Sequence, residues 1–124
     1  MRILLVEDNE LNRDMLTRRL IRRGFSIECA TDGESAVRLA RDQRPDLILM
    51  DIGLPVIDGW EAIRQLKSFP ETQEIPIITL TAHAFSEDQQ RSEASGCAGF
   101  VTKPIDLQRL LDTIAQIGLS VPDK

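Results

Sequence analysis

Short apolar runs alternate with segments of helical periodicity along this chain. The runs lack a regular exchange of polar and apolar positions, which is typical of strands that helices cover on both faces. Strands are therefore expected at residues 3–6, 47–51, 77–81 and 100–102, with a weaker one at 25–29. Because strands and helices alternate about every two dozen residues, the pattern predicts βα units and one parallel sheet.

Helices are predicted between these runs from apolar spacing and from residues that start or stop helices. They are expected at residues 10–23, 31–43, 60–68, 86–95 and 106–117. Thr31 with Glu34, and Ser86 with Gln89, have the spacing of capping boxes. Gly24 can take the left-handed conformation that ends a helix. The fourth helix is mostly polar, so we expect its stability to be low.

The first helix combines an apolar face with a basic end. Its predicted apolar face consists of Leu11, Met15, Leu16 and Leu20. Its last turns carry Arg18, Arg19, Arg22 and Arg23. These arginines either complement the helix dipole at a solvated end or dock an acidic or helical partner, and the two interpretations are compatible.

The 124 residues suffice for one domain with one core, which we expect to span residues 1–124. The net charge of −5 argues against direct binding of nucleic acid, because phosphate contacts require a cationic surface. No apolar run is long enough for membrane insertion, and a strand starts almost at the N-terminus, where a signal peptide would lie. Cys29 and Cys97 lack metal-type or redox-type spacing, so reduced thiols and a cytoplasmic location are expected.

Polar residues follow the apolar runs where each strand is expected to end. Glu7 and Asp8 follow the first run, Asp51 the third, Thr81 the fourth and Lys103 the fifth. In a flavodoxin-like, doubly wound sheet of order 2-1-3-4-5, ligands bind beyond the carboxyl ends of strands 1 and 3. Three carboxylates at that edge would repel one another unless one held a proton or a divalent cation such as Mg²⁺ bound there.

Asp51 is the candidate nucleophile, because a carboxylate oxygen can attack phosphorus and form an aspartyl phosphate. Lys103 would offer an ammonium to one phosphoryl oxygen and Thr81 a hydroxyl to another. Taken singly, Asp8 could be a helix cap, Lys103 a surface lysine and Thr81 a strand residue. The set is more specific than any of its members.

Five motifs in order are similar to those of response-regulator receiver domains of two-component signalling, and they cover essentially the whole chain. They are Val6-Glu7-Asp8-Asn9, Met50-Asp51-Ile52-Gly53-Leu54-Pro55 with Asp58-Gly59, Leu80-Thr81-Ala82, Gly96 with Phe100, and Lys103-Pro104. The resemblance implies the five-stranded doubly wound α/β fold with five helices that the pattern also predicts.

The resemblance implies that Asp51 accepts a phosphoryl group from a histidine kinase or a histidine phosphotransfer domain. Asp8, Asp51 and the Gly53 carbonyl would hold Mg²⁺ directly, Glu7 would act through water, and Mn²⁺ is an alternative metal. Such a protein is a phosphoacceptor that assists its own phosphorylation and dephosphorylation, not an enzyme in the usual sense. Its signal would pass to a downstream protein target.

The resemblance also implies a switch pair, Thr81 and Phe100, and a Lys103-Pro104 bond that is usually cis. The polar fourth helix, the fifth strand and the fifth helix would form the output face. Phe100 lacks the hydroxyl of the commoner Tyr, and Glu7 stands where Asp is also frequent. Gly53 and His83 occupy positions that tune phosphoryl lifetime in such domains, and we expect His83 to be a loop residue without a chemical role.

Three other functions compete with this interpretation. A phosphatase of the haloacid dehalogenase class needs a second aspartate two residues after the nucleophile, where this chain has Gly53. Nucleotide binding lacks its glycine-rich motifs. A docking module with the same fold that works without phosphorylation is the remaining alternative.

Overall fold

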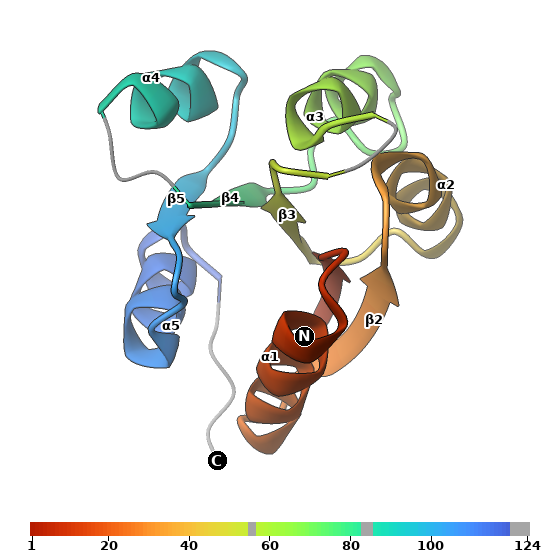
Figure 1. Cartoon of the computed structure of the whole chain (residues 1–124). Helices are drawn as coiled ribbons and strands as arrows, with labels where there is room; N and C mark the ends of the chain where they lie inside the picture. Colours follow the sequence, from red (N-terminus) through yellow and green to blue (C-terminus); the bar gives the residue numbers. More distant parts are fainter. Residues whose placement is uncertain (55–56, 83–85, 120–124) are drawn as a thin grey trace.

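Five parallel strands form a sheet with helices on both faces in the computed structural model, which describes residues 1–54, 57–82 and 86–119 (Figure 1). The helices α1 and α5 cover one face, while α2, α3 and α4 cover the other. The elements are β1 (Arg2–Val6), α1 (Glu10–Arg22), β2 (Ser26–Ala30), α2 (Gly33–Gln43), β3 (Leu47–Asp51), α3 (Gly59–Ser68), β4 (Ile77–Thr81), α4 (Ser86–Ala94), β5 (Gly99–Thr102) and α5 (Leu107–Gln116).

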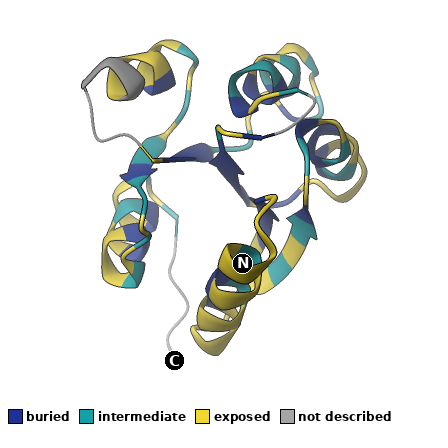
Figure 2. Cartoon of the chain, viewed as in Figure 1, coloured by how far each residue is buried: buried dark blue, intermediate teal, exposed yellow. Residues whose placement is uncertain are grey.

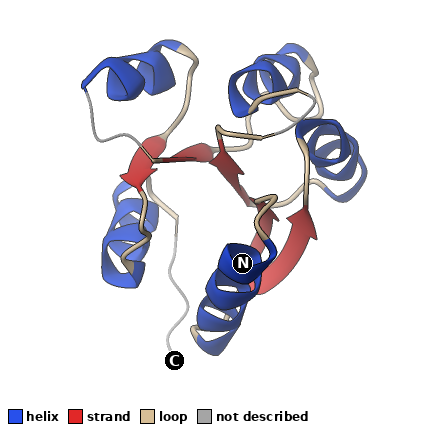
Figure 3. Cartoon of the chain, in the orientation of Figure 1, coloured by secondary structure: helices blue, strands red, loops and turns tan. Residues whose placement is uncertain are grey.

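The strand order is β2-β1-β3-β4-β5 with every pairing parallel, so the predicted doubly wound α/β fold is confirmed (Figure 3). The central strands β3 and β4 are buried along their whole length, which explains their unbroken apolar runs. Edge strand β2 is mostly half-exposed, which explains its weaker signal. The register pairs Val6 with Met50 and Asp51 with Leu80, so residues that follow β1 and β3 reach one edge.

The sheet separates two apolar cores (Figure 2). One packs Leu16 and Leu20 of α1 and the apolar stripe of α5 against the sheet, and the other packs α2 and α3 against the opposite face. The prediction that Leu11 and Met15 share the apolar face of α1 was wrong, because they are 78% and 48% exposed. At about 100° per residue, Leu11 lies on the opposite side of the helix from Leu20.

The helix boundaries agree with the predicted ones to within one or two residues, but one predicted helix cap is wrong. Asp32, not Thr31, caps α2, because its side chain accepts a hydrogen bond from the Ser35 N–H at 2.8 Å. Gly24 and Gly96 have positive φ after α1 and α4, as expected for helix ends. The Ser86 side chain, His83 and Pro55 lie outside the described residues. No helix in the described ranges has the length and hydropathy that a bilayer crossing requires.

The helix α4 is attached to the sheet by polar contacts. Among its described side chains, in residues 89–94, Ser92 is the buried one, and its hydroxyl lies 2.9 Å from the buried hydroxyl of Thr79 on β4. Arg91 lies over the ring of Trp60 on α3, 4.6 Å from the centroid. A hydroxyl pair and a cation–π contact therefore help to hold α4 against its neighbours, whereas the other helices are held by apolar packing.

Removing both hydroxyls of the Thr79–Ser92 pair should destabilise the fold by less than the sum of the two single removals. Ser92→Ala and Thr79→Val should each lower the free energy of unfolding by about 1 kcal/mol, because each leaves a buried hydroxyl with poorer partners. The double variant should lose clearly less than the sum of the two. Urea unfolding of the four proteins measures this coupling, and strictly additive losses would contradict it.

Candidate functional site

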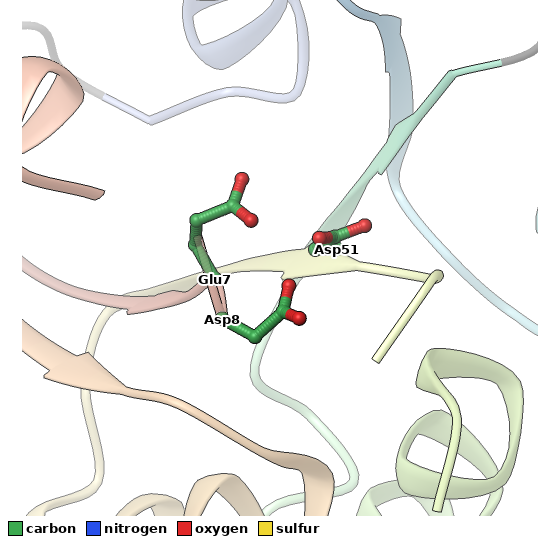
Figure 4. Close-up of side chains that lie close together, drawn as sticks. All are labelled: Glu7, Asp8 and Asp51. Carbon is green, nitrogen blue, oxygen red and sulfur yellow. The ribbon is translucent and has the colours of Figure 1, made fainter. Parts of the chain in front are cut away.

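Three carboxylates converge at the edge of the sheet. Figure 4 shows Glu7 and Asp8 leaving the chain just after β1 and Asp51 leaving it at the end of β3. One carboxylate oxygen from each side chain lies within 4.8 Å of the other two. Glu7 and Asp51 are only 3% and 5% exposed, whereas Asp8 is exposed. The cluster is therefore buried on one side and open to solvent at Asp8.

Lys103 bridges the two buried acids. Its Nζ lies 3.0 Å from Asp51 Oδ2 and 3.0 Å from Glu7 Oε1. The Lys103 backbone N–H donates to the Thr81 carbonyl at 2.6 Å, which ties the start of the β5–α5 loop to the end of β4. A single ammonium thus faces three carboxylates, so the ionised site keeps an excess of negative charge.

Burial and neighbouring side chains alter the pKa of Glu7 and that of Lys103. Burial raises the pKa of Glu7 and the neighbouring Asp51 carboxylate adds to that rise, which Lys103 only partly offsets. Burial alone would lower the pKa of Lys103, but its bonds to Asp51 and Glu7 outweigh burial and raise the pKa. The ammonium is therefore kept charged, while ionisation of Glu7 is disfavoured.

The remaining oxygens of the buried acids are held by the backbone. The Asn9 N–H donates to Glu7 Oε2 at 3.2 Å, and the Gly53 N–H donates to Asp51 Oδ1 at 3.0 Å. No donor from the described part of the chain reaches the Asp8 carboxylate. Hard oxygen ligands, one of them exposed and unpaired, fit a Mg²⁺ ion that keeps several of its waters.

Gly59 lets α3 start against the end of β3. Its N–H donates to the Ile52 carbonyl at 3.1 Å, and a Cβ added there would lie 2.6 Å from the Asp51 carbonyl oxygen. Asp58 caps α3 by accepting from the Glu61 N–H. The Asp58-Gly59 pair was part of the motif in the sequence. The close approach of Gly59 to the end of β3, which leaves no room for a side chain, is shown only by the structure.

Of the two predicted switch residues, Thr81 reaches this edge, whereas Phe100 pairs with Thr79 in the ladder and so lies two positions before it. Thr81 ends β4, is 1% exposed and pairs in register with Thr102, and Phe100 is half-buried on the neighbouring strand β5. The Lys103-Pro104 peptide is cis. Gly53 is exposed beside Asp51, and its side-chain position faces open space apart from an Asp51 oxygen.

One contact of the site was missed by sequence reasoning. The guanidinium of Arg13 on α1 donates through Nη1 to the Glu7 carbonyl at 3.1 Å and lies 3.5 Å from the Asp8 carbonyl. An arginine five residues after Asp8 is a weak signal, because most arginines on a helix point to solvent.

The sequence model of the response regulator receiver domain family matches residues 3–115. The chain belongs to this family. A curated relative, the polar-differentiation response regulator DivK of Brucella anthropi, is 40% identical over 112 residues, which cover 90% of this chain and 91% of that protein.

Solved receiver domains superpose closely on this one. The receiver domain of the sensor histidine kinase PA1611 from Pseudomonas aeruginosa, with a magnesium ion coordinated in its active-site cleft, is 37% identical with a TM-score of 0.85, covering 94% of this chain and 97% of that one. The receiver domain of Saccharomyces cerevisiae Ssk1, solved with the phosphotransfer protein Ypd1, is 31% identical with a TM-score of 0.88, covering 95% and 88%.

The raised pKa of Glu7 predicts a stability loss with rising pH in the metal-free receiver domain. The folded state binds this proton more tightly than the unfolded state, so stability falls as pH rises from about 4.5 through the raised pKa of Glu7. Each unit of the rise corresponds to about 1.4 kcal/mol. Lys103 stays charged throughout, because its pKa is raised from 10.5.

Urea unfolding of wild type and Glu7→Gln across this range, with a chelator present, isolates the effect. The free energy of unfolding of wild type should decline relative to the variant as pH rises and then level off. A difference that does not change with pH, or that changes in favour of wild type, would show that Glu7 ionises normally.

Proposed function

We propose that this receiver domain, spanning residues 1–124, accepts a phosphoryl group on Asp51 from a phosphohistidine. The observation that carries the proposal is the state of the Asp51 carboxylate. It is buried at the end of a rigid strand, with one oxygen held by Lys103 and the other by the Gly53 N–H. Such a carboxylate is positioned as a nucleophile before the donor arrives.

The transfer forms a phosphorus–oxygen bond to Asp51 and breaks the phosphorus–nitrogen bond of the donor. The donor imidazole, protonated on its other ring nitrogen, leaves with the electron pair of that bond and so ends as a neutral ring. Lys103 and Thr81 offer an ammonium and a hydroxyl to two phosphoryl oxygens. The domain therefore takes part once per transfer and assists the later loss of the group, without being an enzyme in the usual sense.

The proposal includes a bound divalent cation, because the carboxylate oxygens of the three acids are suitable ligands for one. Asp8, Asp51 and the Gly53 carbonyl would hold Mg²⁺ directly and Glu7 would act through water, with Mn²⁺ as an alternative of the same ligand preference. A bound cation would neutralise charge shared between the acids and the phosphoryl oxygens. The magnesium ion in the PA1611 receiver domain supports this assignment.

The proposed donor is a histidine kinase or a histidine phosphotransfer domain, and α1 is its docking surface. A groove of about 540 Å³ runs from Glu7 and Lys103 between Met15 and Arg19 on one side and Ile105 on the other. Leu11 and Met15 are exposed and line a second hollow on α1 together with Arg18, Arg19 and Arg22. Apolar side chains flanked by arginines suit a helical partner with acidic residues. The complex of Ssk1 with Ypd1 supports a donor of this kind.

The proposed output is a change at α4, β5 and α5 that a downstream protein reads. Phosphorylation adds about two negative charges beside Thr81 and Lys103. Thr81 and Phe100 form the proposed switch pair, and among the described residues 89–94 of α4 the contacts to neighbouring elements include a hydroxyl pair and a cation–π contact. We infer a shift between conformations that both exist before phosphorylation. A cytoplasmic location completes the proposal, since free Cys29 and Cys97 suit a reducing compartment.

Incubation with acetyl phosphate and Mg²⁺, followed by intact mass spectrometry, should add one phosphoryl group. Asp51→Asn should reduce labelling to background, and so should removal of the metal. Asp58→Asn is the matched control, because it changes a nearby exposed acid and preserves the cap of α3. Labelling that persists in Asp51→Asn would refute the assignment, and an unlabelled wild type would favour the docking module that works without phosphorylation.

Trp60 should report a movement of α4, since it is the one tryptophan of the chain and contacts Arg91. Beryllofluoride with Mg²⁺, which mimics a phosphoryl group, should change the Trp60 emission beyond the effect of Mg²⁺ alone. Arg91→Met, which keeps the apolar stem and loses the cation–π contact, should lack most of that change. An equal change in both proteins would mean that Trp60 senses the acidic site itself and not α4.

A further inference from the structure

Arg13 folds back from α1 over the loop that joins β1 to α1. Its Nη1 lies 3.1 Å from the Glu7 carbonyl oxygen and 3.5 Å from the Asp8 carbonyl oxygen. These carbonyls belong to the two peptide groups on either side of the Asp8 Cα. Because φ and ψ are rotations of those two planar groups, one guanidinium bound to both restrains the backbone conformation of Asp8.

The position of Arg13 is fixed by the first turns of α1. Its backbone N–H donates to the Asn9 carbonyl at 2.9 Å, and the Asn9 side chain caps α1 by accepting from the Asn12 N–H at 3.0 Å. Side chains on a helix lean toward its N-terminus, which directs the Arg13 side chain onto the loop. The capped first turns of α1 therefore fix where the guanidinium lies.

Asp8 depends on this restraint more than the other acids do. The carboxylates of Glu7 and Asp51 are each held by a backbone N–H and by Lys103. The Asp8 carboxylate is exposed and accepts no hydrogen bond from any described residue. Where it lies relative to Asp51 therefore depends on the backbone from which it extends.

We infer that Arg13 is a positioning residue of the cation site: it aims the Asp8 carboxylate at Asp51 and so sets the affinity for a divalent cation. The inference rests on the proposed function only in that the acids take up Mg²⁺. It requires no phosphoryl transfer, so metal binding alone can test it.

Charge and positioning predict opposite effects for Arg13. No carboxylate in the described ranges lies within ion-pair distance of its guanidinium, so the positive charge is not neutralised by a neighbour. If Arg13 acted only through its positive charge, it would repel Mg²⁺, and its removal would tighten Mg²⁺ binding. If Arg13 acts by restraining the loop, its removal would weaken Mg²⁺ binding, because Asp8 loses its orientation.

Calorimetric titration of the full chain with Mg²⁺ distinguishes the two. Arg13→Gln should raise Kd about tenfold, as for other residues that orient a metal ligand. Arg13→Lys, which keeps the charge but has a shorter side chain, should lie between Arg13→Gln and wild type. Arg18→Gln removes the same charge from an exposed position of the same helix, and its Kd should stay within about twofold of wild type.

A second measurement separates positioning from general damage. At saturating Mg²⁺ the rate of labelling by acetyl phosphate in Arg13→Gln should return close to the wild-type rate, because the altered step is metal uptake. Thermal unfolding shows whether each variant is folded, and Arg13→Lys serves if Arg13→Gln is not.

Each outcome decides the matter. An unchanged or lower Kd in Arg13→Gln, or equal losses in Arg13→Gln and Arg18→Gln, overturns the positioning role and leaves the phosphoacceptor proposal intact. A wild type that binds Mg²⁺ but is never labelled removes the phosphoacceptor proposal and leaves the role of Arg13 standing. A wild type that takes up no Mg²⁺ overturns both.

Discussion

Mutual repulsion among Glu7, Asp8 and Asp51 is the constraint around which this receiver domain is organised. Two of the three acids are buried within 3.0 Å of the single ammonium of Lys103, and that one cation cannot neutralise all three. When no metal is bound, such a site lowers the stability of the folded state, so other parts of the structure must offset this unfavourable free energy. The two apolar cores that sandwich the sheet supply the compensation.

The parts of the site differ in how firmly they are held, and this matches the roles proposed for them. Asp51 ends a fully buried strand and is paired with Leu80 in the ladder, so its backbone is rigid. Asp8 lies on a short exposed loop that the Asn9 cap and Arg13 restrain. The helix α4 is held by the Thr79–Ser92 hydroxyl pair and by the contact of Arg91 with Trp60. A rigid acceptor beside a helix attached through polar contacts suits a domain that receives a group and changes shape.

Most of the fold and the members of the acidic site could be predicted from local patterns. Unbroken apolar runs identified β3 and β4, because strands buried on both faces leave no polar position. The placement of Glu7, Asp8, Asp51 and Lys103 at one edge followed from parallel strand ends. Helix starts were less certain: Thr31 and Asp32 are both good caps, and only the path of the chain selected Asp32.

The sequence by itself determined which segments become strands and helices, and which polar residues end the strands, because these depend on neighbours a few positions away. Tertiary structure alone decided that Leu11 and Met15 face solvent, that Thr79 meets Ser92, and that Arg13 reaches the Glu7 carbonyl. Such contacts depend on how helices rotate and seat against the sheet. That seating is settled by the packing of the whole core, and no local pattern encodes it.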